Sequence, residues 1–148
     1  MHSLKDLDVT KLADVPYRFE ITDDVTGRGV GIFLHVIGGH SQKILDFVKE
    51  HENEQRVAEE MAKKRDPRNK QVHVRKFEDD IRYSNELVAI RVTEWEGIEE
   101  PCTLENAIQL CQINPPYKEQ ILGKSEDMRN FMRPFTTKPG STSDTLPG

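Results

Sequence analysis

Five histidines are the residues of this chain best suited to bind a metal ion, but their spacing does not favour a metal site. His35 and His40 flank the segment "VIGG", so one falls in an expected strand and the other follows a glycine turn. Helical zinc sites use two histidines four residues apart on one helix face, and thiolate sites pair cysteines with histidines. His51 lies in the polar middle of an expected helix and His73 in a basic connection. We therefore expect no metal ion and no other cofactor.

The segment "TGRGVG", residues 26–31, superficially resembles a glycine-rich phosphate-binding loop. It lacks the lysine and serine of a P-loop and the helix that should follow, so a hairpin turn explains it better. No serine stands in the sequence context of a nucleophile elbow. The carboxylates are numerous, but many fall on an expected solvated helix face: Glu50, Glu52, Glu54, Glu59 and Glu60. The sequence pattern indicates no nucleophile beside a general base. We therefore expect that this protein is not an enzyme.

A run of basic residues between positions 63 and 76 could contact an acidic partner, with only Asp66 opposing it. The basic residues are Lys63, Lys64, Arg65, Arg68, Lys70, Arg75 and Lys76. No aromatic side chains interleave with them for base stacking, and the chain as a whole carries a formal net charge of -5. A solvated connection, or a patch that docks on an acidic protein, is therefore favoured over a nucleic-acid site.

Two cysteines, Cys102 and Cys111, stand in a chain whose first residues, "MHSLKDLDVT", do not have the order of a signal peptide. We expect free thiols and a cytoplasmic protein, because disulfides persist mainly in oxidising compartments. No apolar run approaches the roughly 20 residues that a membrane-spanning helix needs. We therefore expect no membrane association.

The first elements that must position these residues form a β-hairpin. Residues 1–16 are a polar lead-in that ends at Pro16, and "YRFEIT", residues 17–22, then alternates apolar and polar side chains as a half-buried strand does. The turn segment "DDVTGRG" separates it from "VGIFLHVI", an apolar and β-branched run of strand length. Two such runs around a turn predict an antiparallel hairpin.

A long helix should follow from Gln42 to Arg65, with Ser41 as its N-cap. Its apolar residues are concentrated in the first turns, while "EHENEQ" in its middle is hydrophilic. We expect the helix to pack at its start and to project into water farther on. Pro67 ends or kinks this helix, so residues 66–75 form a connection.

Residues 77–95 fit two interpretations. Apolar residues recur at spacings of three and four from Phe77 to Trp95, as on one helix face, yet "VAIRV" alone alternates as a strand. Nineteen residues without Gly or Pro favour a helix, because a strand of that length is unusual. We predict a helix, and the choice between helix and strand for residues 86–93 stays open.

Gly97 should end this helix with a left-handed backbone, and Thr103 should cap a new helix. The apolar face of this short helix would be Leu104, Ala107, Ile108 and Cys111. A last helix should start at Pro116 or Tyr117 and continue toward Met132. Residues 134–148 are rich in Pro, Gly, Ser and Thr and predict a disordered tail. The prediction is an α+β protein, with an N-terminal antiparallel β-hairpin followed by a mostly α-helical part of about four helices in a single domain, residues 17–133.

Trp95, the only tryptophan, stands two positions before Gly97, in the joint that leads to the next helix. A ring at such a joint can bury on the order of 200 Å² and fix the angle between two elements. A packing role is therefore the favoured interpretation, with a role as a partner anchor as the alternative.

Three segments of the chain resemble the tail assembly chaperones of long-tailed bacteriophages. "ITDDVTGRGVGIFLHVIGGHS" is similar to the short strand, TG turn and second strand of that family. "ELVAIRVTEWEGIEEPCTLENAIQLCQ" is similar to its apolar run, Trp-x-Gly-Ile unit and following helix start, and "PYKEQILGKSEDMRNFM" to its last helix. The resemblance spans roughly residues 16–133, and the long basic connection has no counterpart in the family's usual pattern.

The resemblance implies a non-enzymatic protein of the host cytoplasm that binds the tape measure protein, keeps it soluble and helps recruit tail tube protein. It also implies absence from the mature virion. Self-association stays open as a further interaction. The alternatives are a structural tail or head-tail connector subunit that remains in the virion and, less favoured, a small nucleic-acid-binding regulator.

A chaperone of a long helical client needs shallow apolar grooves between its own elements. Residues that could line such grooves are apolar and lie on the expected helix faces or at the joint. They are Leu87, Ile90, Trp95, Ile98, Leu104, Ile108, Ile121 and Leu122. A place in the core is the favoured interpretation for each of them.

Overall fold

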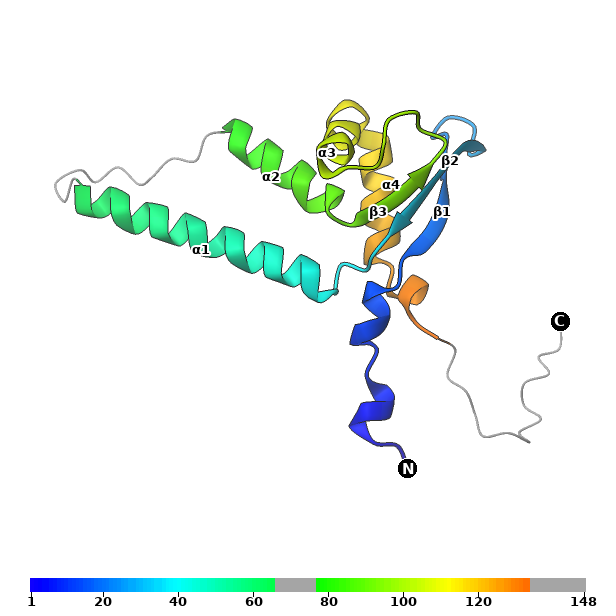
Figure 1. Cartoon of the computed structure of the whole chain (residues 1–148), viewed down its shortest axis with the longest axis horizontal. Coiled ribbons are helices and arrows are strands. Elements are labelled where there is room, and N and C mark those ends of the chain that lie inside the picture. Colours follow the sequence, from blue (N-terminus) through cyan, green and yellow to red (C-terminus); the bar gives the residue numbers. More distant parts are fainter. Residues whose placement is uncertain (66–76, 134–148) are drawn as a thin grey trace.

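The computed structural model describes residues 1–65 and 77–133. The predicted basic connection at 66–75 and the predicted tail at 134–148 lie outside these ranges. The elements, with η for a 3-10 helix, are η1 (Leu4–Leu7), η2 (Thr10–Asp14), β1 (Tyr17–Thr22), β2 (Gly29–Val36), α1 (Gln42–Arg65), α2 (Phe77–Ala89), β3 (Val92–Glu96), α3 (Leu104–Ile113), α4 (Pro115–Glu126) and η3 (Met128–Phe131). The described ranges thus confirm the predicted α+β class, with a leading hairpin and four α-helices (Figure 1).

Strands β1 and β2 form the predicted antiparallel hairpin, in which Phe19 pairs with Leu34. Phe19 and Ile21 of β1 are buried while their neighbours in the strand are exposed, as the alternation predicts. The turn is closed by a hydrogen bond from the backbone N of Asp23 to the carbonyl O of Arg28, 2.8 Å away. The glycine-rich segment is therefore a hairpin turn.

The predicted helix over residues 77–95 is wrong in its last part. Helix α2 ends at Ala89, the chain turns at Ile90 and Arg91, and Val92–Glu96 forms β3, antiparallel to β2. Val36 pairs with Val92. Strand β2 has a second edge whose backbone groups need partners, and the β-branched and aromatic residues of 92–96 suit a strand. The strand order is β1-β2-β3.

Trp95 accordingly lies on a strand, opposite Leu34, and not at the end of a helix. Gly97 follows β3 with φ +89°, so its left-handed backbone ends a strand where we predicted the end of a helix. An added Cβ at Gly97 would lie 2.3 Å from the carbonyl O of Gly31. The close approach to the start of β2 therefore requires glycine at this position.

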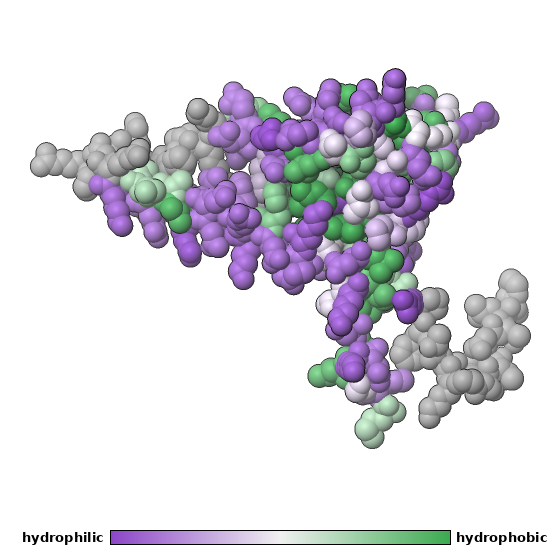
Figure 2. Space-filling view, viewed as in Figure 1, coloured by the Kyte–Doolittle hydropathy of each residue, from purple (hydrophilic) through white to green (hydrophobic). Residues whose placement is uncertain are grey.

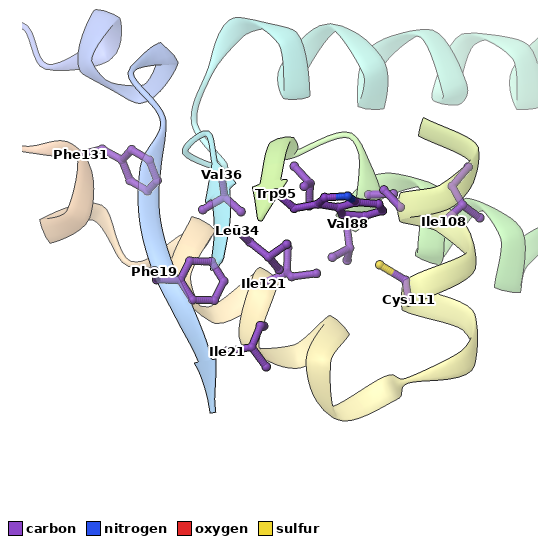
Figure 3. Packing of buried hydrophobic residues seen from close by; sticks show 13 residues of the cluster. Phe19, Ile21, Leu34, Val36, Val88, Trp95, Ile108, Cys111, Ile121 and Phe131 are labelled. Atoms are coloured by element: carbon purple, nitrogen blue, oxygen red, sulfur yellow. The ribbon is translucent and has the colours of Figure 1, made fainter. Parts of the chain in front are cut away.

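The core lies between the sheet and helices α2, α3 and α4 (Figures 1 and 3). Strand residues face helix residues across it. Its buried members are Phe19, Ile21, Leu34, Val36, Val88, Ala89, Val92, Trp95, Ala107, Ile108, Cys111, Ile121 and Phe131. Trp95 is 8% exposed, which agrees with the packing role predicted for it.

Helix α1 packs only at its beginning, as predicted. Ile44 is 2% exposed and forms a small separate cluster with Ile37 and Ile90. Farther along the helix, Val57 is 50% exposed and Met61 is 58% exposed. The backbone N of Ile44 lies 3.5 Å from the Oγ of Ser41, the predicted cap. Figure 1 shows α1 extending away from the sheet.

Helices α3 and α4 begin at side-chain caps. The Oγ1 of Thr103 accepts a hydrogen bond from the backbone N of Asn106, as predicted, and the Oδ1 of Asn114 accepts one from Tyr117. The last predicted helix is shorter than expected, because Asp127 ends α4 and caps the separate η3 turn. This turn buries Phe131 against the sheet.

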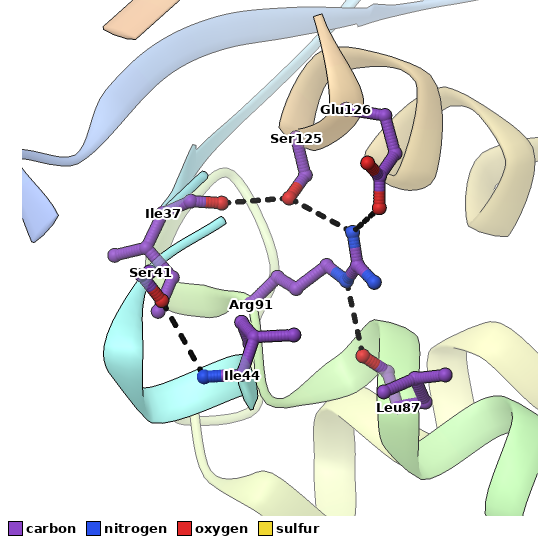
Figure 4. A network of polar contacts seen from close by, with 7 residues as sticks. All are labelled: Ile37, Ser41, Ile44, Leu87, Arg91, Ser125 and Glu126. Carbon is purple, nitrogen blue, oxygen red and sulfur yellow. Dashed lines mark hydrogen bonds and ion pairs between the residues drawn. The ribbon is translucent and has the colours of Figure 1, made fainter. Parts of the chain in front are cut away.

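A buried arginine joins three elements of the domain (Figure 4). Arg91 donates from Nε to the carbonyl O of Leu87 at 3.1 Å and from Nη1 to the Oγ of Ser125 at 3.2 Å. Nη1 also contacts the carboxylate of Glu126. Ser125 in turn donates to the carbonyl O of Ile37 at 2.7 Å. The network connects the end of β2, the α2–β3 turn and the end of α4.

Candidate interaction surface

The eight residues predicted to line an apolar groove fall into three groups. Ile90, Trp95, Ile108 and Ile121 are buried, with exposed fractions from 0 to 8%, so a client could reach them only where an edge is uncovered. Three others, Leu87, Ile98 and Leu122, are half-buried against the core. Leu104 alone is exposed, at 44%. The structure therefore assigns half of the predicted set to the interior.

Two residues of the predicted set, Trp95 and Ile98, meet at one surface hollow. Two apolar residues of α3 that the prediction omitted, Leu110 and Ile113, complete its apolar wall. The hollow has a volume of about 130 Å³. Ile113 is 69% exposed, so the wall is open to solvent on that side. Polar groups of Glu100, Asn106 and Gln109 form the rim.

The segment between β3 and α3 gives the hollow its shape. The indole Nε1 of Trp95 donates a hydrogen bond to the carbonyl O of Glu100 at 2.8 Å. The side-chain Nδ2 of Asn106 donates to the carbonyl O of Pro101, also at 2.8 Å. These two bonds hold the segment against α3, and the positive φ of Gly97 directs the chain into it. The ring of Trp95 is thus fixed before any partner arrives.

One feature of the sequence could have predicted that Leu110 and Ile113 line the hollow. Helix α3 carries apolar residues beyond its core-facing stripe: Leu110 is half-buried at the margin of the core, and Ile113, three residues later, is 69% exposed. A helix that is apolar on two sides has one side to offer to a second partner. The prediction considered only the core-facing stripe.

Leu87 and Ile90 serve a different purpose. Together with Ile37, Ile44 and Phe47 they hold the first turns of α1 against the domain. A larger hollow of about 350 Å³ lies beside this contact, between α1 and α2, but most of its wall is charged. Its lining residues are Phe47, Glu50, His51, Glu54, Asp79, Arg82, Tyr83 and Glu86. An apolar side chain would fit the smaller hollow at Trp95 better, because charged walls must be desolvated.

The histidines and cysteines occupy separate places. His35 contacts Glu96 at 3.2 Å, and the ring of His51 stacks on Tyr83 with their centroids 3.5 Å apart. Within residues 1–65 and 77–133, no three His, Cys, Asp or Glu side chains are grouped so that they could hold a metal ion. Cys102 and Cys111 are free thiols, as predicted. Burial raises the pKa of Cys111 to about 11.

The predicted basic run is only partly described. Lys63 and Lys64 are exposed near the end of α1, and Arg65 is its last residue. The other four lie outside the described residues: Arg68, Lys70, Arg75 and Lys76. The run therefore stays a prediction as a docking patch.

Comparison of the chain with protein-family models, curated proteins and solved structures finds no match in any of the three. Among the helices in the described ranges, none has the length and apolar content needed to cross a membrane.

Proposed function

We propose that this protein is a non-enzymatic assembly chaperone of a long-tailed bacteriophage, which binds the tape measure protein and helps recruit tail tube protein. It would act in the host cytoplasm and leave before the tail is complete. The proposal is supported by the resemblance of three sequence segments to that family. It is supported on this chain's own residues by the open apolar hollow beside Trp95.

The hollow suits the side chain of a helical client. A long helical protein exposes apolar side chains along one face until its partners enclose it, and a chaperone can cover them one anchor at a time. The hollow combines a fixed aromatic wall, the flexible side chains of Leu110 and Ile113, and a polar rim. Anchor sites of interfaces have this composition, since a central apolar contact is sealed from water by polar surroundings.

The charge of the chain supports the same role. A formal net charge of -5 on this chain favours solubility through mutual repulsion. Acidic residues are spread over α1 and the start of α2, while the hollow lies on the other side of α3 from the core-facing stripe. A bound client would therefore be carried on a particle with a charged exterior.

Co-expression with the tape measure protein tests the function and the site together. The wild-type chain should bring the tape measure protein into the soluble fraction. Ile113→Glu should abolish this effect, because a carboxylate on the wall of the hollow would oppose entry of an apolar side chain. Val25→Glu is the matched control, because Val25 is 93% exposed in the hairpin turn, far along the chain from the hollow.

The possible outcomes of these experiments contradict different parts of the proposal. A wild-type chain that leaves the tape measure protein insoluble would contradict the chaperone function. Equal activity of the Ile113→Glu and wild-type proteins would exclude the hollow as the binding site. Mass spectrometry of finished virions separates the chaperone from a structural subunit, because only a structural subunit would be found there in many copies.

A further inference from the structure

One side of α1 carries a stripe whose end charges are complementary when the stripe is reversed. Glu50, Glu54, Val57, Met61 and Lys64 follow one another at alternating spacings of four and three residues, so they lie along one side of the helix. All five side chains are exposed. Read along the chain, the stripe is acidic, then apolar, then basic.

This stripe runs along the flank of the helix, and its first two residues, Glu50 and Glu54, also border the hollow between α1 and α2. Ile44 and Phe47 attach the first turns of α1 to the domain, and His51 stacks on Tyr83 of α2. At 3.6 residues per turn, Val57 lies about 220° around the helix from Ile44 but only about 80° from Phe47, so the stripe follows the flank of α1. Figure 2 shows apolar surface toward the far end of α1, and Val57 and Met61 are 50% and 58% exposed.

The charges are placed symmetrically about the apolar centre. Glu50 lies seven residues before Val57 and Lys64 seven residues after it, about 10 Å away on either side. If a second α1 is placed antiparallel with its Val57 against this one, each Glu50 faces the Lys64 of the other copy. In a parallel arrangement, Glu50 would face Glu50 and Lys64 would face Lys64.

From this symmetry we propose that two copies of this chain pair through α1, antiparallel and about a twofold axis at Val57. The partner that binds the stripe is therefore a second copy of this chain, because in an antiparallel pair Glu50 of each copy faces Lys64 of the other. The two outward ion pairs set the direction, Val57 meets its counterpart at the axis, and Met61 lies against the aliphatic stem of Glu54 of the other copy. The pairing is independent of the proposed function, since it uses a different surface from the hollow beside Trp95.

The pairing should be weak and sensitive to salt. Four helical turns from each copy bury less surface than most stable dimers, and the two ion pairs are exposed to solvent. Sedimentation equilibrium at protein concentrations up to about 1 mM should show a dimer whose fraction rises with concentration. An increase from about 50 to about 500 mM salt should raise the dissociation constant several-fold.

Charge reversal tests the arrangement. Lys64→Glu and Glu50→Lys should each reduce self-association about tenfold or more, because each places like charges opposite one another twice in the dimer. A chain with both changes should dimerise like the wild type, since the two charges have exchanged places. An equimolar mixture of the two single variants should also form a dimer, because their charges are complementary to each other.

The neighbouring residues Glu52 and Lys63 provide matched controls. Both are exposed charges on α1, but neither lies on the stripe. Glu52→Lys and Lys63→Glu should therefore keep the affinity of the wild type within about twofold, apart from small long-range effects.

Three results would overturn the proposal: a monomer at every concentration, a dimer indifferent to the charges at 50 and 64, or failure of the double change to restore pairing. A strictly monomeric chain would leave the stripe to a client helix. A chain that dimerises but does not solubilise the client would contradict only the proposed function. A chain that solubilises the client but stays monomeric would contradict only the pairing.

Discussion

The Nη1 of Arg91 donates a hydrogen bond to the Oγ of Ser125 across 3.2 Å, although the two residues are 34 positions apart in the chain. Arg91 is only 4% exposed, and Ser125 is fully buried. The sequence gives no sign of this pair, because an arginine between Ile90 and Val92 is expected to face solvent. The contact fixes where α4 ends relative to the α2–β3 turn.

Replacing Arg91 should destabilise the protein much more than replacing an exposed arginine. Arg91→Met keeps most of the apolar volume but removes the donor to the buried carbonyl of Leu87 and one of the two hydrogen bonds of Ser125, which still donates to the carbonyl O of Ile37. Each buried group without a partner costs about 1–3 kcal/mol, and Glu126 stays hydrated because its side chain is 56% exposed. We expect a loss of about 2–3 kcal/mol in the free energy of unfolding, measured by urea denaturation.

Arg82→Met is the control for this measurement. Arg82 pairs with Glu105 at 3.5 Å, but both side chains are more than half exposed. Exposed pairs contribute less than about 1 kcal/mol, so this variant should remain close to the wild type. Equal losses for the two variants would show that the buried network contributes no special stability.

Trp95→Ala should cost about 3–5 kcal/mol of unfolding free energy, as for other buried aromatic residues. Trp95→Phe should cost less than Trp95→Ala, because it keeps an aromatic ring in the core. Its remaining cost comes from the lost hydrogen bond to the carbonyl of Glu100. Thermal denaturation followed by circular dichroism measures both, since neither variant retains a tryptophan. If Trp95→Ala keeps the wild-type Tm but no longer binds the client, Trp95 is a contact residue and not a core residue.

Gly97→Ala and Gly123→Ala should change stability in opposite directions. At Gly97, φ is +89° and the new methyl group would meet the carbonyl O of Gly31 at 2.3 Å. Strained positions of this kind cost about 1–3 kcal/mol before the clash is counted. At Gly123, within α4, nothing lies within 4 Å of the added Cβ, and Ala is the better helix former by about 1 kcal/mol. Chemical denaturation of both variants checks the expected signs, and a tolerated Gly97→Ala would contradict the close strand contact.

The two cysteines should differ in their reactivity toward iodoacetamide. Burial raises the pKa of both thiols, that of Cys111 to about 11, and Glu94 adds to the effect at Cys102. A raised pKa leaves less thiolate at pH 8, by about a hundredfold for Cys111 relative to an unfolded chain. Cys102 is half-buried and Cys111 is 1% exposed, so Cys102 should react first.

Mass spectrometry of the alkylated peptides measures this order at pH 8, with a urea-denatured sample as the reference. Raising the pH toward 10 should accelerate modification of Cys102 before that of Cys111, since the thiol with the higher pKa gains thiolate last. Equal rates in the folded protein would mean that Cys111 is not held in the core.

Elements with local signals could be predicted from the chain alone. Alternation in residues 17–22 and the following turn residues specify the hairpin, because a strand with one buried face needs that period. Ser41 and Thr103 mark helix starts through the hydrogen bonds that their side chains offer to the next turn. The concentration of apolar residues in the first turns of α1 determined that its far end would project from the domain.

Segments whose sequences suit two conformations acquire one of them through long-range contacts. The sequence leaves residues 86–93 open between helix and strand, and the division into α2 and β3 depends on the free edge of β2, which lies more than fifty residues before β3 in the chain. The same holds for the candidate site. Trp95 lies in β3 and Ile98 just after it, whereas Leu110 and Ile113 belong to α3. Only folding brings these four residues to one hollow. Burial of Ile90, Ile108 and Ile121 likewise depends on which neighbours cover them, and periodicity along one helix carries no such information.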